Sequence, residues 1–348
     1  MRLINCKTRQ LKEYFGSKIP PYAILSHTWG HEEVTFAEFT GDQAAARRKE
    51  GYTKIDFTCR QALKDNLKYA WVDTCCIDKT SSAELSEAIN SMFAWYASSQ
   101  ICYVYFSDVL KTTLQTSFRR SRWFTRGWTL QELIAPSDVK FFDRDWDYLG
   151  TRDDLKEDII KITSISESAL FKAAKLNYQD HRALGLGQYS VAKRMSWAAQ
   201  RITTRIEDSA YCLLGIFDIN MPLLYGEGSR AFIRLQQAIM QKTNDHSIFA
   251  WGFQLDSKHH LQQAREAGAM PSEYSLIDSH LLAQSPADFK KCANVERATI
   301  STAAFTMTNA GLEIEFPLVP LSNGPSYRGR RDKLSSRSSR QDTRFESA

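Results

Sequence analysis

The sequence contains no long uninterrupted hydrophobic run, so a membrane-spanning helix is not expected. Its most apolar stretch, residues 210–225, is interrupted by Asp218 and Asn220, whereas a span needs about 18 or more consecutive apolar residues. Residues 1–15 carry basic side chains but lack the apolar segment of a secretory signal. We therefore expect neither membrane insertion nor export.

Motifs for metal ions and nucleotide phosphates are also missing. None of the seven cysteines forms a CxxC pair, and no Cys/His group has the spacing of a zinc site. The pair His259 and His260 reads as an exposed loop, and no GxxxxGK[ST] loop is present. The sequence predicts no metal, no resident cofactor and a cytoplasmic protein with reduced cysteines, several of which lie in apolar runs.

The net charge is small and concentrated at one end. The chain has 45 Lys and Arg against 40 Asp and Glu, a net charge of +5, and residues 321–348 hold seven basic and three acidic side chains. The rest is almost neutral, so a nucleic-acid surface is not expected. We expect residues 321–348 to be a disordered basic tail; the alternative is a tail that docks on acidic partners.

The first half alternates strand and helix patterns. A chain of 348 residues has room for about two domains. Strands alternating with helices predict an α/β fold, in which a parallel sheet has helices on both faces. We assign residues 1–150 to this core. The predicted strands are 22–26, 69–73, 101–106 and 139–142, and the predicted helices are 42–67, 81–96 (with Ser81 as cap) and 123–135.

The second half differs in character. Residues 151–245 form a predicted helical extension, and residues 246–320 a small β-rich region. Within the extension, Thr204 and Glu207 have the spacing of a capping box that opens a helix through residue 217. The segment 226–228 (GEG) reads as a turn before a helix over residues 229–242.

Polar side chains follow every predicted strand of the core. They include Ser26, His27, Asp73, Ser107, Asp108 and Asp143. Ligands of open parallel sheets bind beyond the carboxyl ends of the strands, so these residues predict a site. The alternative is equally open, because strand-to-helix loops are polar wherever they lie on a surface.

The densest cluster of functional side chains is the segment 122–132 (RWFTRGWTLQE). Trp128 and Glu132 are four residues apart and share one helix face, and Arg126 lies just before them. An amphipathic helix with a packed Trp and a solvated Glu explains the pattern as well. For a second charged cluster, Arg201, Arg205, Glu207 and Asp208, helix caps and surface pairs are the favoured interpretation.

Three segments together resemble the heterokaryon incompatibility (HET) domain of fungi: 22–30 (YAILSHTWG), 71–78 (WVDTCCID) and 126–136 (RGWTLQELIAP). Residues 201–211 and 222–228 look like the extension found in that family, and residues 246–320 like an accessory segment that often follows it. The resemblance implies a role in fungal nonself recognition and programmed cell death, a form of innate immunity. Many members also carry a nucleotide-binding oligomerisation domain, which these residues lack, so a self-contained sensor is not expected.

HET domains are in turn similar to Toll/interleukin-1 receptor (TIR) domains, which have a flavodoxin-like sheet. Some TIR domains cleave NAD with a glutamate in a WxxxE helix after the third strand, and Trp128 and Glu132 have that spacing and position. The resemblance implies Glu132 as the catalytic carboxylate, with NAD as substrate rather than cofactor. By their positions, Ser26, His27 and Trp29 would line the pocket, Asp73 would hold a ribose hydroxyl, and Arg126 the pyrophosphate, beside Trp128.

The competing hypothesis is a non-catalytic signalling module. In that case the domain associates with itself or with other incompatibility proteins, and the WxxxE helix is structural.

Overall fold

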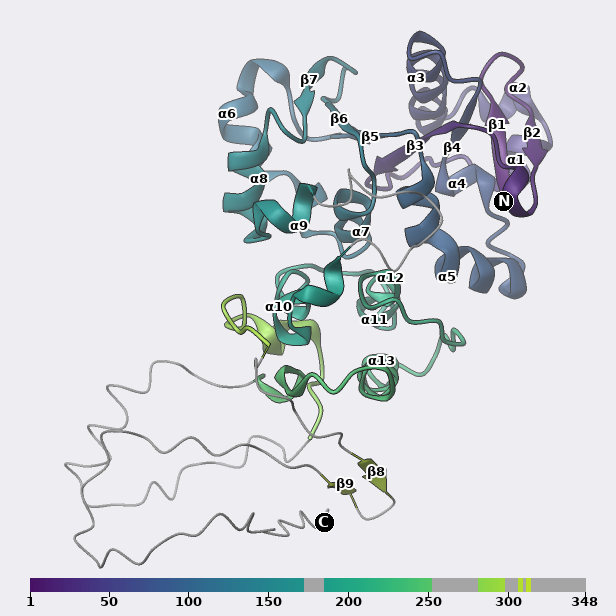
Figure 1. The fold of residues 1–348 in the computed structure, drawn as a ribbon. Helices are drawn as coiled ribbons and strands as arrows, with labels where there is room; N and C mark the ends of the chain where they lie inside the picture. Colours follow the sequence, from purple (N-terminus) through teal and green to yellow (C-terminus); the bar gives the residue numbers. More distant parts are fainter. Residues whose placement is uncertain (172–184, 252–280, 298–305, 309–310, 314–348) are drawn as a thin grey trace, which may run out of the picture.

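A seven-stranded sheet runs through the N-terminal part of the protein, in the upper half of Figure 1. The computed structural model describes residues 1–171, 185–251, 281–297, 306–308 and 311–313. The strand order is β2-β1-β4-β3-β5-β6-β7, in which β4, β3, β5 and β6 run parallel and β1, β2 and β7 pair antiparallel at the two edges. The strands are β1 (Arg2–Asn5), β2 (Leu11–Glu13), β3 (Tyr22–His27), β4 (Tyr69–Trp71), β5 (Ile101–Tyr105), β6 (Val139–Phe142) and β7 (Tyr148–Thr151).

The four parallel strands are those that the sequence predicts, so the α/β fold class is confirmed. Taken in chain order, these strands lie 2-1-3-4 across the sheet, which is the order of flavodoxin-like sheets. Such a sheet has its topological switch point between the first and third strands, here β3 and β5. The antiparallel edge strands were not predicted, because strands of three or four residues carry too little periodicity to detect.

Helices cover both faces of the sheet, as the alternation of side chains along β3 demonstrates. Neighbouring residues of a strand point to opposite faces. His27 contacts Lys54 on α3, whereas Ser26 contacts Glu132 on α7, so α3 and α7 pack on opposite faces (Figure 1). The helices of residues 1–171 are α1 (Phe36–Thr40), α2 (Gln43–Ala46), α3 (Glu50–Lys64), α4 (Asp73–Cys76), α5 (Ser82–Ser98), α6 (Leu114–Ser117), α7 (Thr129–Ile134), α8 (Lys156–Thr163) and α9 (Glu167–Phe171).

Two of the predicted core helices are divided. The stretch 42–67 contains α2 and α3, and the first turn of α3 packs closely on the loop before α1: a Cβ at Gly51 would lie 2.4 Å from the Glu32 carbonyl. The stretch 123–135 is a 3-10 helix, η4 (Arg122–Thr125), followed by α7. Between them Arg126 is extended, since its backbone bridges to Ile202. Of the capping box expected from Ser81 and Glu84 at the start of α5, the Ser81 half is confirmed, because its hydroxyl accepts from the Glu84 amide. The Glu84 carboxylate accepts from the Asp78 amide instead.

The extension is helical, but its expected capping box is wrong. The helix expected after the capping box begins at Asp208. The Glu207 carboxylate does not cap it, but accepts hydrogen bonds from the amides of Gly226 and Gly228. Those glycines have φ angles of +104° and +61°, which confirms the predicted turn. The helices here are η7 (Leu186–Gln188), α10 (Val191–Ser196), α11 (Asp208–Tyr211), α12 (Leu214–Phe217) and α13 (Arg230–Lys242).

Only part of the predicted β-rich region is described. It contains the 3-10 helices η8 (His246–Phe249) and η9 (Pro286–Phe289) and an antiparallel pair, β8 (Thr306–Thr308) with β9 (Gly311–Glu313). The His259–His260 pair and the basic tail lie outside the described residues. Within the described ranges, no helix is long and apolar enough to cross a membrane. All seven cysteines are buried and free.

The helical extension packs directly on the α/β core. A Cβ built on Gly215 of α12 would lie 2.0 Å from the Cβ of Phe93 on α5, so only glycine permits this approach. Figure 1 shows α11 and α12 directly beside α5 and α7.

We predict that Gly215→Ala weakens this contact. Overpacking a close-packed site costs about 1–3 kcal/mol, which outweighs the gain of about 1 kcal/mol that alanine brings to a helix. Urea denaturation measures the difference. The control is Gly187→Ala, because a Cβ at Gly187 meets no atom within 4 Å. Equal stabilities of the two variants would contradict the contact.

Candidate functional site

A buried hydrogen-bonded chain joins three of the strand and helix ends at one edge of the sheet. The Trp123 indole N–H donates to Ser26 Oγ over 2.9 Å, and Ser26 Oγ donates to Glu132 Oε2 over 2.5 Å. Ser26 is fully buried and Glu132 is 7% exposed. Ser26 therefore lies behind Glu132 and holds its carboxyl group from the protein interior.

Burial changes the acidity of Glu132. Desolvation raises its pKa to about 8, and the nearby negative charge of Asp73 acts in the same direction. The hydrogen bond from Ser26 and the charge of Arg201 partly oppose this. A carboxyl group that titrates near neutral pH can exist in either protonation state, which is a common property of functional carboxyls.

His27, on the other face of β3, lies in a network with fixed proton positions. Lys54 Nζ is 3.0 Å from His27 Nδ1, and Asp73 Oδ1 is 3.0 Å from His27 Nε2. An ammonium group can only donate, so Nδ1 is the acceptor and Nε2 carries the proton that binds Asp73. Lys54 also pairs with Glu33. This network orients Asp73 beside the carboxyl end of β3.

Asp73 is the most heavily contacted of the predicted residues. It accepts from the Trp29 indole at 2.9 Å and from Lys79 at 3.4 Å, in addition to His27. Burial alone would raise the pKa of Asp73, but Lys79, His27 and Trp29 hold it well below the ordinary value. Asp73 is thus ionised at neutral pH. Trp29 is 49% exposed, with Lys79 Nζ 3.6 Å from its ring centroid.

A cation lies at the topological switch point. Arg122 donates to Thr28 Oγ1 at 3.1 Å and to Ser107 Oγ at 3.3 Å, and so joins the ends of β3 and β5. It also donates to the Trp29 carbonyl at 3.2 Å. Its guanidinium is therefore fixed beside the predicted ligand-binding edge of the sheet.

Arg126 and Trp128 face a different part of the molecule. Arg126 donates to Thr204 Oγ1 at 3.1 Å. Trp128 hydrogen-bonds to Asp208, where it helps to offset the rise in pKa that burial produces. The structure thus brings Ser26, His27, Trp29, Asp73 and Glu132 together, but turns Arg126 and Trp128 toward the helical extension.

Several residues of the cluster were not predicted from the sequence. Lys54 had a detectable signal, since it is a charged residue on the buried, apolar face of α3. The second charged cluster was misread in part, because Arg201 is half-buried and bonds inward: its guanidinium donates to the Arg126 carbonyl and to Thr129 Oγ1, both at 2.8 Å. Arg122 and Trp123 gave no signal beyond their position in the motif.

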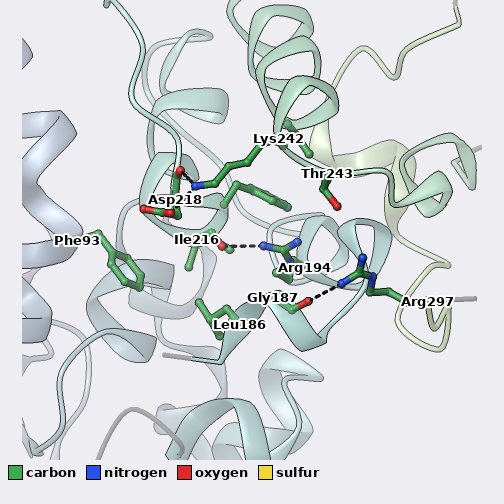
Figure 2. Close-up of a pocket in the computed structure, with 12 residues that line it drawn as sticks. Phe93, Leu186, Gly187, Arg194, Ile216, Asp218, Lys242, Thr243 and Arg297 are labelled. Carbon is green, nitrogen blue, oxygen red and sulfur yellow. Dashed lines mark hydrogen bonds and ion pairs between the residues drawn. The ribbon is translucent and has the colours of Figure 1, made fainter. Parts of the chain in front are cut away.

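A pocket of about 260 Å³ lies elsewhere, among the helices of the extension (Figure 2). None of the predicted site residues lines it. In the part of the chain that the structure describes, no group of three His, Cys, Asp or Glu side chains is arranged to hold a metal ion.

The fold and the cluster define an α/β domain that holds two carboxyl groups near the carboxyl ends of parallel strands, the buried Glu132 and the ionised Asp73. Residues 22–119 match the family model described as "Heterokaryon incompatibility protein (HET)", and residues 230–343 match "Domain of unknown function (DUF8212)". Residues 22–119 are thus similar to the HET domain, the family that the motifs predict.

The chain is also similar to the "Vegetative incompatibility protein HET-E-1" of Podospora anserina. The two are 47% identical over 242 residues, which cover 66% of this chain and 17% of the relative. This chain thus spans only a small part of that relative's length. No solved structure gives a significant match.

We predict that Glu132 makes stability depend on pH. Its pKa is about 8 in the folded protein against 4.5 as the ordinary value, so between these limits the folded state holds a proton that the unfolded chain releases. The free energy of unfolding contributed by Glu132 is complete below pH 4.5 and is lost as pH rises, at up to about 1.4 kcal/mol per pH unit.

Urea denaturation of the wild type and Glu132→Gln from pH 5 to pH 8.5 measures this effect. The variant is expected to lose less stability than the wild type over the range. Glu87→Gln, at an exposed position, is the matched control. Parallel curves for Glu132→Gln and the wild type would show that Glu132 has an ordinary pKa.

Proposed function

We propose that this chain acts in fungal nonself recognition and programmed cell death, and that it does so by a TIR-like cleavage of NAD with Glu132 as the catalytic carboxylate. The observation that carries the proposal is the place of Glu132. It is a buried carboxyl of raised pKa at the carboxyl end of β3, beside the switch point where flavodoxin-like sheets bind ligands. The incompatibility role is supported by the match of residues 22–119 to the HET family and by the name of the relative.

The reaction breaks the bond between ribose C1′ and the nicotinamide nitrogen. The electron pair leaves with nicotinamide, which departs as a neutral base, and positive charge develops on the ribosyl group, as in glycoside hydrolysis. The ionised form of Glu132 stabilises this charge in a site of low dielectric constant. Water then adds to C1′ and releases one proton, so that the products are ADP-ribose and nicotinamide.

Other residues of the cluster would bind the substrate. Asp73, ionised and adjacent to Trp29, is suited to accept from a ribose hydroxyl. The exposed ring of Trp29 offers a face for a flat ring to stack on. Arg122, fixed between β3 and β5, is better placed for the pyrophosphate than Arg126, which lies against Thr204.

One observation favours the alternative of a non-catalytic module. Glu132 is 7% exposed and is satisfied by Ser26, an arrangement that also suits a structural carboxyl. In that case the chain signals by associating with itself or with other incompatibility proteins. Catalysis therefore requires that substrate or self-association open a path to Glu132.

NAD consumption by purified protein separates the two proposals. We expect the wild type to release nicotinamide at a rate steeper than linear in protein concentration if self-association completes the site. Glu132→Gln should lower the rate at least about 100-fold, the scale of losing one group that stabilises the charge of the transition state. The rate should rise with pH toward about 8, because the ionised carboxylate is the active form.

Glu87→Gln is the control and should retain the wild-type rate. Absence of NAD loss at every concentration, and also after forced clustering of folded protein, would contradict catalysis. Cell killing that survives Glu132→Gln with the fold intact would then support the non-catalytic module.

A further inference from the structure

The pocket in the helical extension has an apolar wall and a cationic end. Its volume is about 260 Å³, just below the range of ordinary ligand pockets, about 300–1,000 Å³. Figure 2 shows Arg194 near the middle of the lining side chains, with Arg297 on one side and Lys242 on the other. The apolar lining residues are Phe93, Leu186, Ile216, Phe217 and Ile239.

Arg194 is the central feature of this pocket. It is 8% exposed, and its Nη1 donates to the Ile216 carbonyl at 3.1 Å. The guanidinium carbon is 4.5 Å from the centroid of the Phe217 ring. Its Nε is buried without a hydrogen-bond partner, and no carboxylate of the described residues forms an ion pair with it. A buried cation with an unused donor is costly unless an anion binds it.

The neighbouring cations already have partners of their own. Lys242 pairs with Asp218. Arg297 donates to the Gly187 carbonyl at 3.2 Å, and its Nε is 3.6 Å from Asp245. Arg194 is therefore the lining cation whose charge is not matched by a carboxylate within 4 Å. Burial lowers its pKa to about 10, so it stays charged at neutral pH.

We propose that this pocket binds a small organic anion, with its carboxylate or phosphate group on Arg194 and its apolar body against Phe217 and Ile216. A guanidinium matches the oxygens of either group, and Arg194 is among the residues that line the pocket. The volume suits a molecule with one ring or a short aliphatic chain. This site is separate from the Glu132 cluster and does not depend on the proposed NAD cleavage.

The position of the pocket gives ligand binding a structural consequence. Phe93 belongs to α5 of the α/β core, whereas Arg194, Ile216 and Ile239 belong to α10, α12 and α13 of the extension. Both parts therefore line the pocket. Because the anion binds only the folded arrangement, it should raise the melting temperature, by an amount that grows with the ligand concentration.

Calorimetric titration and thermal melting of the whole chain, at constant ionic strength, test the proposal. The probes are phenyl phosphate, phenylacetate, inorganic phosphate and phenol. We expect saturable binding of at least one of the two aromatic anions, weaker binding of inorganic phosphate and none of phenol. Comparison of phenyl phosphate with phenylacetate identifies the anionic group. Absence of saturable binding by both aromatic anions overturns the proposal.

Two variants test whether the anion binds in this pocket. Arg194→Gln should weaken it at least about tenfold, the scale of a charge-assisted hydrogen bond, and Arg297→Gln, which removes a charge at the rim, about threefold. If Arg194→Gln does not fold, Arg297→Gln decides. Arg144→Gln, an exposed arginine of the α/β core, should bind as the wild type does. Unchanged affinity in the folded pocket variants overturns the proposal.

Discussion

Burial of the Glu132 carboxyl is the constraint on which the organisation of the sheet edge depends. An ionised carboxylate removed from water costs several kcal/mol unless it is paired or hydrogen-bonded. The protein supplies a hydroxyl donor from Ser26, which Trp123 fixes in turn, and a nearby cation from Arg201. Three separate segments must therefore be in place before Glu132 can occupy its position, and this ties the carboxyl to the complete fold.

The alternation of side chains along β3 divides the cluster into two parts. Ser26 points toward Glu132, while His27, its neighbour, points toward Lys54 on the opposite face. The two parts meet again beyond the end of the strand, where Asp73 raises the pKa of Glu132 through its charge. One short strand thus helps to position a carboxyl of raised pKa and a carboxyl of lowered pKa whose charges interact, the kind of pair from which acid and base roles arise.

The same helical extension supports both candidate sites. Arg201 donates to the backbone at Arg126, and the bridge between Arg126 and Ile202 holds the start of α7. Further along, Gly215 lets α12 press on α5 and closes one side of the anion pocket. Substitutions at the interface between core and extension would therefore affect both the Glu132 cluster and the pocket, because both contain residues from the two parts.

The parallel strands, the Ser81 cap of α5, the turn at residues 226–228 and the similarity to the HET domain were predictable from the sequence, since these depend on local periodicity, local hydrogen bonds and motif order. Which side chains meet was not predictable. Trp128 and Glu132 belong to one motif, yet Trp128 hydrogen-bonds to Asp208 whereas Glu132 hydrogen-bonds to Ser26. Contacts such as Lys54 with His27 join residues far apart in the chain, and no local pattern encodes the packing that brings them together.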